Sequence, residues 1–134
     1  MNVEIPYGIP NRPTPEGSNL DRLLPPRVGN FVRDPIKPPG KGMPIYADYR
    51  RGPAGIFVEL GICDDARDAY SAVQTAAGET GIADQIVESG GISCLHTVNA
   101  DGAFIAWTRG RYYFSAYAKG GAKDLDEFMA AFPY

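Results

Sequence analysis

The stretch from Gly91 to Gly120 constrains the fold most strongly, because apolar-rich runs alternate in it with turn-forming residues. Runs of β-branched and aromatic residues bounded by Asn, Asp and Gly are typical of antiparallel strands joined by hairpins. The stretch therefore predicts a three-stranded meander. Its strands are expected at residues 92–98, 103–109 and 111–118, with turns at 99–102 and 109–110.

Side chains alternate along a strand, so the two faces of this meander can be assigned without knowing the register. The predicted core face carries Ile92, Cys94, His96, Val98, Ala103, Ile105, Trp107, Arg109, Tyr112, Phe114, Ala116 and Ala118. The predicted outer face carries Ser93, Leu95, Thr97, Phe104, Ala106, Thr108, Arg111, Tyr113, Ser115 and Tyr117. Aromatic rings mixed with hydroxyls and a cation are typical of binding surfaces, although Tyr and Thr also suit a half-solvated strand.

A strand pair and a helix are expected before the meander. Residues 45–50 and 56–63 flank a Gly- and Pro-containing segment at 51–55, which predicts a hairpin with a five-residue loop. Asp64 or Asp65 can then cap an amphipathic helix that ends near Gly78 and Gly81. Its apolar side is formed by Ala66, Ala69, Tyr70, Val73, Ala76 and Ala77.

A short last helix is expected after the meander, with Asp124 as N-cap and an apolar stripe of Leu125, Phe128, Met129 and Phe132. The order of the elements predicts an α+β fold. In it, an antiparallel sheet, made of the hairpin and the three-stranded meander, has two helices packed on one face.

The N-terminal segment differs in composition from the rest of the chain. Residues 1–18 carry prolines at positions 6, 10, 13 and 15, which predicts an extended Pro-rich arm ahead of a single α+β domain at 19–134. Such an arm lies on its own domain, on a neighbouring copy or on another subunit. Ser18 or Asn19 is expected to cap a helical turn, and residues 28–33 are expected to form a short strand. Residues 34–42 should form a loop, whose Gly-Lys-Gly triplet lacks Walker spacing.

Charge and hydropathy argue against several classes of partner. The chain of 134 residues has 13 basic and 16 acidic residues, a net charge of −3, which gives no basic footprint for nucleic acid. No apolar run is long enough for a direct membrane span. No signal peptide follows Met1, so we expect a cytoplasmic protein if Met1 is the natural start, and an extracytoplasmic one if a leader was removed.

Residues with catalytic or metal-binding chemistry are few and scattered. Cys63 and Cys94 are expected on opposite faces, so buried free thiols are favoured over a single bridge between neighbouring strands. His96 is the only histidine, and a core or core-edge position two residues from Cys94 does not suit a nucleophile–base pair. Asp64, Asp65 and Asp68 cluster where a helix needs capping. We therefore predict no catalytic residue, no metal and no cofactor.

Two resemblances bear on the class of protein. The Leu23-Leu24-Pro25 segment, followed by Val28-Gly29-Asn30-Phe31-Val32-Arg33, resembles the beginning of an α+β domain in a bacterial family of exported proteins of unknown function. The predicted order of elements is similar to the PsbP-like α+β sandwich of extrinsic photosystem subunits. Both resemblances imply an α+β fold, and neither implies a catalytic residue.

We therefore expect a non-catalytic protein-binding module, an accessory or assembly subunit. Its partners would be other protein subunits, including those of a membrane-associated complex. The residues expected to bind the partner, which include Tyr–Arg pairs near two hairpin ends, are Tyr7, Arg12, Arg50, Arg51, Phe104, Arg111, Tyr113 and Tyr117. The alternative is a small-ligand-binding protein or enzyme with a pocket lined by Tyr70, Cys94, His96 and Trp107.

Overall fold

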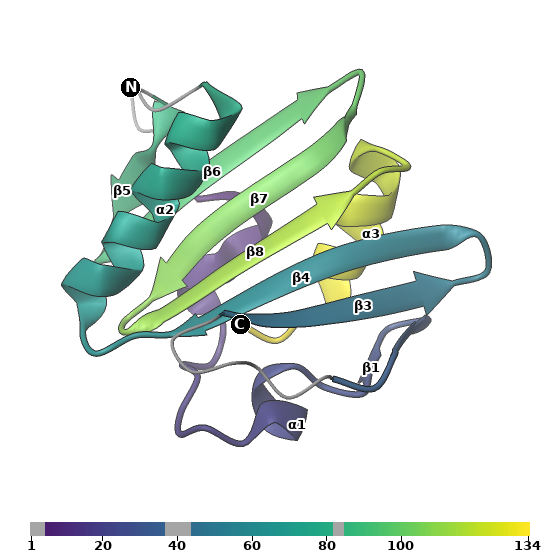
Figure 1. The fold of residues 1–134 in the computed structure, drawn as a ribbon, viewed down its shortest axis with the longest axis horizontal. Helices are drawn as coiled ribbons and strands as arrows, with labels where there is room; N and C mark the ends of the chain where they lie inside the picture. Colours follow the sequence, from purple (N-terminus) through teal and green to yellow (C-terminus); the bar gives the residue numbers. More distant parts are fainter. Residues whose placement is uncertain (1–4, 37–43, 82–84) are drawn as a thin grey trace.

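Antiparallel strand pairing organises the chain (Figure 1). The structure is a computed structural model, and it describes residues 5–36, 44–81 and 85–134. The described strands form one sheet in the order β1-β2-β3-β4-β8-β7-β6-β5. The mixed α+β class was predicted, but the sheet is larger than expected. Its strands are β1 (Arg27–Val28), β2 (Phe31–Arg33), β3 (Ile45–Arg51), β4 (Ala54–Ile62), β5 (Val87–Ser89), β6 (Ile92–Asn99), β7 (Gly102–Arg109) and β8 (Tyr112–Ala118).

The register of β6, β7 and β8 agrees with the faces assigned from the sequence. His96 pairs with Ile105, and Trp107 pairs with Phe114, so these side chains share one face. The β7–β8 loop consists of Gly110 and Arg111, and Gly110 has a φ of 59°, which suits a two-residue hairpin turn.

The β3–β4 hairpin corrects the expected five-residue loop. Arg51 pairs with Ala54, so only Gly52 and Pro53 form the turn. The reason is the backbone freedom of Gly52, whose φ of 57° allows the ladder to continue up to the turn. Strand β4 then pairs along its length with β8, which joins this hairpin to the meander.

The helices lie on opposite faces of the sheet, which corrects the prediction that both pack on one face. Helix α2 (Ala66–Thr80) covers the face toward the viewer in Figure 1, the front face, whereas α3 (Ala122–Ala131) lies behind the sheet. The front face carries Leu95 and Ala106, both fully buried, and these pack with Val73 of α2. The sequence interpretation gave too much weight to hydroxyls on this face and too little to its small apolar residues.

Helix termini follow capping rules with one exception. Asp65 caps α2, where its carboxylate accepts a hydrogen bond from the Asp68 N–H at 2.9 Å, and Gly81 ends the helix in a left-handed conformation. The predicted N-cap of α3 is wrong. Gly121 occupies that position, and Asp124 lies in the first turn, where it pairs with Arg51 at 3.4 Å.

The N-terminal arm packs on its own domain, and it is only partly extended. Residues Pro6–Asn11 form a 3-10 segment, η1, behind the sheet, so the expectation of a wholly extended arm is wrong. Prolines suit the first positions of a helical turn because their φ is already fixed near the helical value. Ile5 and Ile9 are buried in the back core. Helix α1 (Leu20–Leu23), capped by Asn19, follows as predicted.

The back core contains most of the buried aromatic rings. Phe31 and Tyr49 contact the ring of Phe128 edge to face, with centroids 5.6 and 5.0 Å away. The predicted stripe of α3 is buried there. No helix in the described part of the chain is both long and apolar enough to cross a bilayer. The Gly-Lys-Gly triplet and residues 82–84 lie outside the described residues.

Candidate functional site

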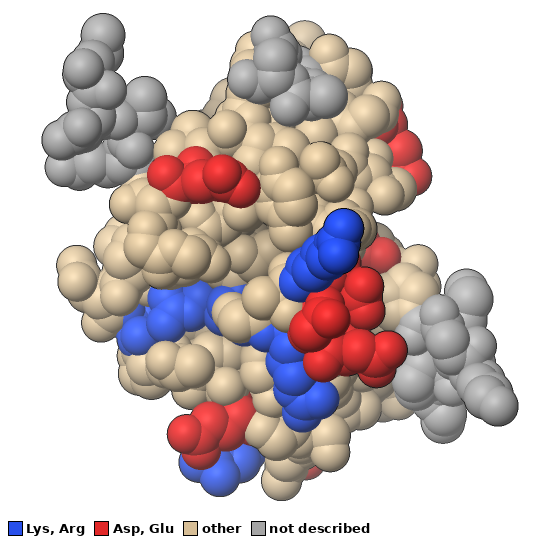
Figure 2. Space-filling view, turned by 90° about the vertical axis from the view of Figure 1, so that its left-hand side faces the viewer, with Lys and Arg blue, Asp and Glu red and all other residues tan. Residues whose placement is uncertain are grey.

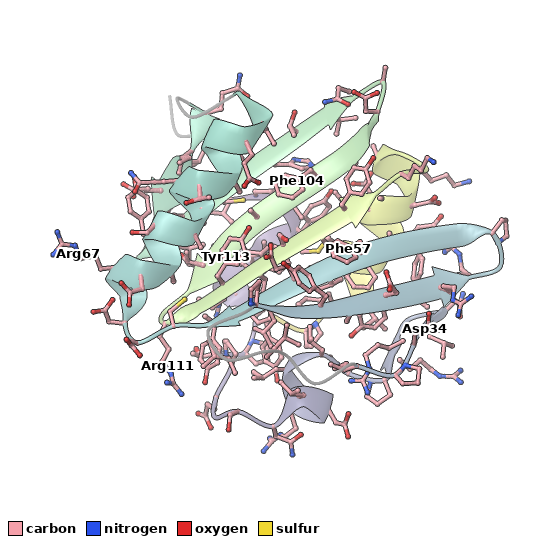
Figure 3. The ribbon with its side chains drawn as sticks, in the orientation of Figure 1. Asp34, Phe57, Arg67, Phe104, Arg111 and Tyr113 are labelled. Carbon is pink, nitrogen blue, oxygen red and sulfur yellow. The ribbon has the colours of Figure 1, made fainter. Side chains whose placement is uncertain are left out.

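Helix α2 covers only part of the front face and leaves aromatic side chains exposed on the rest. Tyr46 of β3 and Phe57 of β4 stack with ring centroids 5.3 Å apart, and they are 44% and 42% exposed. Phe104 and Tyr117, both half-buried, pair across β7 and β8 on the same face. Figure 3 shows Phe57 and Phe104 pointing from the sheet toward the viewer. We call Tyr46, Phe57, Phe104 and Tyr117 the front surface.

A cavity of about 610 Å³ lies between α2 and the front face, and we call it the α2 cavity. Apolar side chains of α2 and the backbone of Gly61 line it, together with the rings of Phe104 and Tyr113. The carboxylates of Glu59 from β4 and Glu79 from α2 face the same space. The described lining therefore combines aromatic rings with two acids and contains no Lys, Arg or His.

Glu59 is the most unusual residue of this cavity because it is an acid on a half-buried strand position. The Ser115 hydroxyl donates a hydrogen bond to its Oε2 at 3.4 Å. Burial raises the pKa of Glu59, and the negative charge of Glu79 raises it further, while the Ser115 hydrogen bond lowers it. No ion pair involving Glu59 is present among the described residues.

Tyr113 and Cys63 border the same cavity. Tyr113 is only 5% exposed, and burial, followed by the charge of Glu59, raises the pKa of its hydroxyl above the ordinary range. Burial also raises the pKa of the Cys63 thiol, helped by the neighbouring aspartates that precede and begin α2. Both groups are thus neutral at pH 7, and neither is an activated nucleophile.

The structure gathers only part of the predicted partner-binding set. Phe104, Tyr113 and Tyr117 share the front face, as the meander parity predicts. Arg50 lies at the other end of that face, exposed and paired with Asp34 at 2.8 Å. Arg111 is exposed at the β7–β8 loop, where its guanidinium lies 5.3 Å from the Tyr112 ring centroid.

The remaining predicted cations are used within the chain. Arg51 lies over the Phe31 ring at 4.4 Å and pairs with Asp124 and Glu127 of α3. Arg12 donates hydrogen bonds to backbone carbonyls near the end of α3, at Phe132 (2.6 Å) and Met129 (2.5 Å).

The idea that Tyr–Arg pairs at the two hairpin ends form one patch is wrong. Strand β4 pairs with Tyr112 at Ile62 and with Ala118 at Ile56, so the β7–β8 and β3–β4 turns lie at opposite ends of the sheet. Figure 2 shows acidic side chains beside basic ones on the flank where Figure 3 places Arg67 and Arg111. This flank therefore has no single-sign charged patch.

A second cluster lies on the back face, where the arm meets the sheet. The Tyr7 hydroxyl donates to Asp126 Oδ1 at 2.5 Å and lies 3.4 Å from His96 Nε2. Although His96 is exposed at the core edge, partial desolvation of its ring lowers its pKa, while the charge of Asp126 opposes this shift. Tyr7 has a φ of 62°, a left-handed conformation that is uncommon for a residue other than glycine.

His96 lies on the predicted face, at the exposed edge of the core rather than inside it. Among the described residues, β5 pairs only with residues 92–94 of β6, so His96 has no described strand beside it on that edge. Cys94, two residues earlier, is 2% exposed, and burial raises the pKa of its thiol to about 12. Both cysteines are free, as predicted.

The four residues of the predicted ligand pocket do not line one cavity. Trp107 is fully buried and stacks on Phe114 with centroids 5.4 Å apart. Cys94 and Trp107 face the back core, whereas Tyr70 lines a separate cavity of about 350 Å³ on the front side of the sheet. Among the described residues, no group of three or more His, Cys, Asp or Glu side chains could hold a metal ion.

The α2 cavity was missed by sequence reasoning, although a signal for it exists. Glu59 is the one charged residue in the alternating run from Ile56 to Ile62, and the helix that follows carries alanines rather than large residues. A scan against models of protein families finds no match for this chain. Searches among curated proteins and solved structures also find no match.

Proposed function

We propose that this chain is a non-catalytic protein-binding module, an accessory or assembly subunit, which docks on another protein through the front surface. The observation that carries the proposal is the exposed stack of Tyr46 and Phe57 on the part of the front face formed by β3 and β4. Large aromatic rings that stay exposed together, rimmed by polar groups, are typical of protein interfaces.

The surroundings of the stack support docking by a protein rather than a nucleic acid. Asp48 and Arg50 follow Tyr46 on the same face of β3, and Asp48 pairs with Phe57 across to β4, so charges of both signs lie beside the aromatic rings. Such a polar rim around an apolar centre fits a protein partner that presents apolar side chains to the stack. Burial raises the pKa values of Tyr113 and Cys63, so both side chains are neutral at pH 7. This supports a role without covalent chemistry.

The arm contributes less to this proposal than the front surface does. Arg12 and Tyr7 bind groups of the same chain, and Ile5 and Ile9 belong to the back core. Removing residues 1–18 would therefore expose the back core, and the result would not report on an interface alone. Exposed arm positions such as Asn11 and Thr14 allow the arm contact to be tested without this effect.

The test is native mass spectrometry of the protein isolated gently from its natural source, as wild type and as Phe57→Asp. Val98→Asp is the matched control, because Val98 is also an exposed apolar strand residue, 52% exposed, but lies on the back face opposite Ala103. Circular dichroism melting checks that both variants fold.

The outcomes separate the two parts of the proposal. An assembly that survives Val98→Asp and is lost with Phe57→Asp supports docking through the front surface. An assembly that survives both substitutions shows that another surface binds the partner. A wild-type protein that is isolated only as a monomer contradicts the role as a subunit.

A further inference from the structure

The α2 cavity carries a second inference, which does not depend on protein docking at the front surface. Its described lining presents two carboxylates and two aromatic rings, with no basic side chain. We propose that the α2 cavity binds an organic ammonium group carried on an apolar stem.

The first argument is charge. Glu59 is half-buried, and the carboxylate of Glu79 faces the same space. A half-buried carboxylate beside a second negative charge is unfavourable in its ionised form, and a bound cation would offset this cost. An ammonium group would interact favourably with both carboxylates, whereas an anionic ligand would be repelled by them.

The second argument is the chemistry of the walls. The rings of Tyr113 and Phe104 line the cavity, and a cation close to the face of an aromatic ring is attracted to it. Ala72 and Ala76 on α2 leave room for an apolar stem between the helix and the sheet. A neutral apolar ligand would fill the same space but leave the carboxylates without a partner.

The third argument is size and the nature of the ligand. A volume of about 610 Å³ lies within the range of small-molecule sites, which is roughly 300–1,000 Å³. A bare metal ion is a poor fit, because no metal-binding group of three acidic, His or Cys side chains occurs in the described residues. An ammonium group on an apolar stem would pair with the two acids and contact the aromatic rings, while its stem fills the remaining space.

This chemistry has two sources, a free amine and the lysine side chain of a peptide. The experiment therefore titrates the protein at pH 7 with phenethylammonium and with N-acetyl-lysine amide, and follows backbone amide chemical shifts by NMR. Phenethyl alcohol and phenylpropionate serve as neutral and anionic controls of similar shape. We expect shifts at residues around Tyr113 and Phe104 with one or both ammonium ligands.

Variants separate the role of charge from that of shape. Glu59→Gln should weaken ammonium binding about tenfold, which corresponds to ~1.4 kcal/mol. Ala72→Phe should abolish binding by filling the cavity without changing its charge. Glu88→Gln is the matched control and should leave the affinity unchanged, because Glu88 is an exposed acid on β5 that accepts a hydrogen bond from Ser93, 3.2 Å away.

Each outcome decides the proposal. Binding of phenethylammonium supports a free amine as ligand, and binding of N-acetyl-lysine amide alone supports a lysine side chain. Equal binding of the alcohol or of phenylpropionate overturns the assignment of an ammonium ligand. The absence of shifts with both ammonium ligands at millimolar concentrations also overturns it, and neither result bears on docking at the front surface.

Discussion

The hydroxyl of Tyr7 donates a hydrogen bond to the carboxylate of Asp126, 2.5 Å away, across a sequence separation of 119 residues. This contact joins the N-terminal arm to α3. The same hydroxyl lies 3.4 Å from Nε2 of His96, and the two rings meet edge to face with centroids 5.5 Å apart. The arm, the last helix and the meander thus converge on one cluster of polar side chains.

The first prediction concerns the only histidine. Partial desolvation lowers the pKa of His96 and the charge of Asp126 raises it, so Asp126→Asn should lower the pKa of His96 further. NMR titration of the imidazole protons measures this shift. Tyr7→Phe retains the Asp126 charge and serves as the control. An unchanged or raised pKa of His96 in Asp126→Asn would show that the charge of Asp126 does not reach the ring.

The same shift has a consequence for stability. The folded-state pKa of His96 is lowered, so the folded protein favours the neutral ring. The stabilisation that this pKa difference provides is complete at pH values above the unfolded-state pKa of about 6.5. It decreases as the pH falls through that value toward the folded-state pKa. His96→Gln should remove this part of the pH dependence, which urea unfolding at several pH values measures.

Sequence reasoning worked where a local rule decides the structure. The face assignments of the meander and the capping roles of Asn19 and Asp65 needed only strand parity and turn chemistry. It did worse where tertiary packing decides. Leu95 and Ala106 alone do not indicate which helix will cover them, and the buried role of Arg109 depends on an arm about a hundred residues away.

The cavity illustrates the same limit. The alternation of side chains along the strands placed Glu59 and Tyr113 on the outer face. The cavity beside them exists only because α2 crosses the front face and stops short of β3. That position follows from packing of small residues against Leu95, which no local pattern specifies. Residue types can therefore predict an outward-facing acid, but not that the acid borders a cavity.

The second prediction tests how the arm is held. Arg109 is 6% exposed, and its guanidinium donates hydrogen bonds to the backbone carbonyls of Ile9, Arg12 (3.0 Å) and Pro13 (3.4 Å). Arg109→Met keeps much of the apolar stem but removes these bonds, and it should destabilise the protein by about 2–4 kcal/mol. Urea unfolding measures the loss, and limited proteolysis should cut the arm faster.

Arg111→Met is the control for this experiment, because Arg111 is exposed two residues away. Its effect should stay within about 0.5 kcal/mol. Equal effects of the two substitutions would contradict a special role of Arg109 in holding the arm.

The third prediction concerns Trp107 in the back core. Trp107 is fully buried, and its indole N–H has no hydrogen-bond partner among the described residues. Trp107→Ala should cost about 3–5 kcal/mol because it leaves a large cavity. Trp107→Phe should cost only about 1 kcal/mol, since the lost volume is offset by removal of an unpartnered donor. A cost of Trp107→Phe close to that of Trp107→Ala, measured by chemical denaturation, would contradict the expected offset.

The fourth prediction compares two glycines of opposite behaviour. Gly102 has a φ of 142°, and a Cβ there would lie 2.7 Å from the carbonyl oxygen of Ala118, so Gly102→Ala should cost about 2 kcal/mol. Gly78 lies inside α2 with open space around it, so Gly78→Ala should stabilise by about 0.5–1 kcal/mol. Thermal unfolding monitored by circular dichroism should thus shift in opposite directions, and shifts of the same sign would contradict this assignment.

The fifth prediction asks whether Glu59 is kept for folding or for binding. Its folded-state pKa is raised by burial and by the charge of Glu79, so the ionised carboxylate works against the fold. The favourable contribution of the protonated form is complete below the unfolded-state pKa and is lost as the pH rises through the folded-state pKa. Glu59→Gln mimics the protonated form and should therefore raise the melting temperature at pH 7, but not under acidic conditions where the wild-type residue is already protonated.

Several neighbouring groups face Glu59 and must be included in this comparison. They are Ser115 on β8, Tyr46 on β3, and Glu79 on α2. Glu79→Gln, at an exposed position, is the control and should change the melting temperature less. A gain in stability from Glu59→Gln at pH 7 would mean that this acid weakens the fold that carries it, which is typical of residues kept for binding. A loss would instead assign Glu59 a structural role through its hydrogen bond with Ser115.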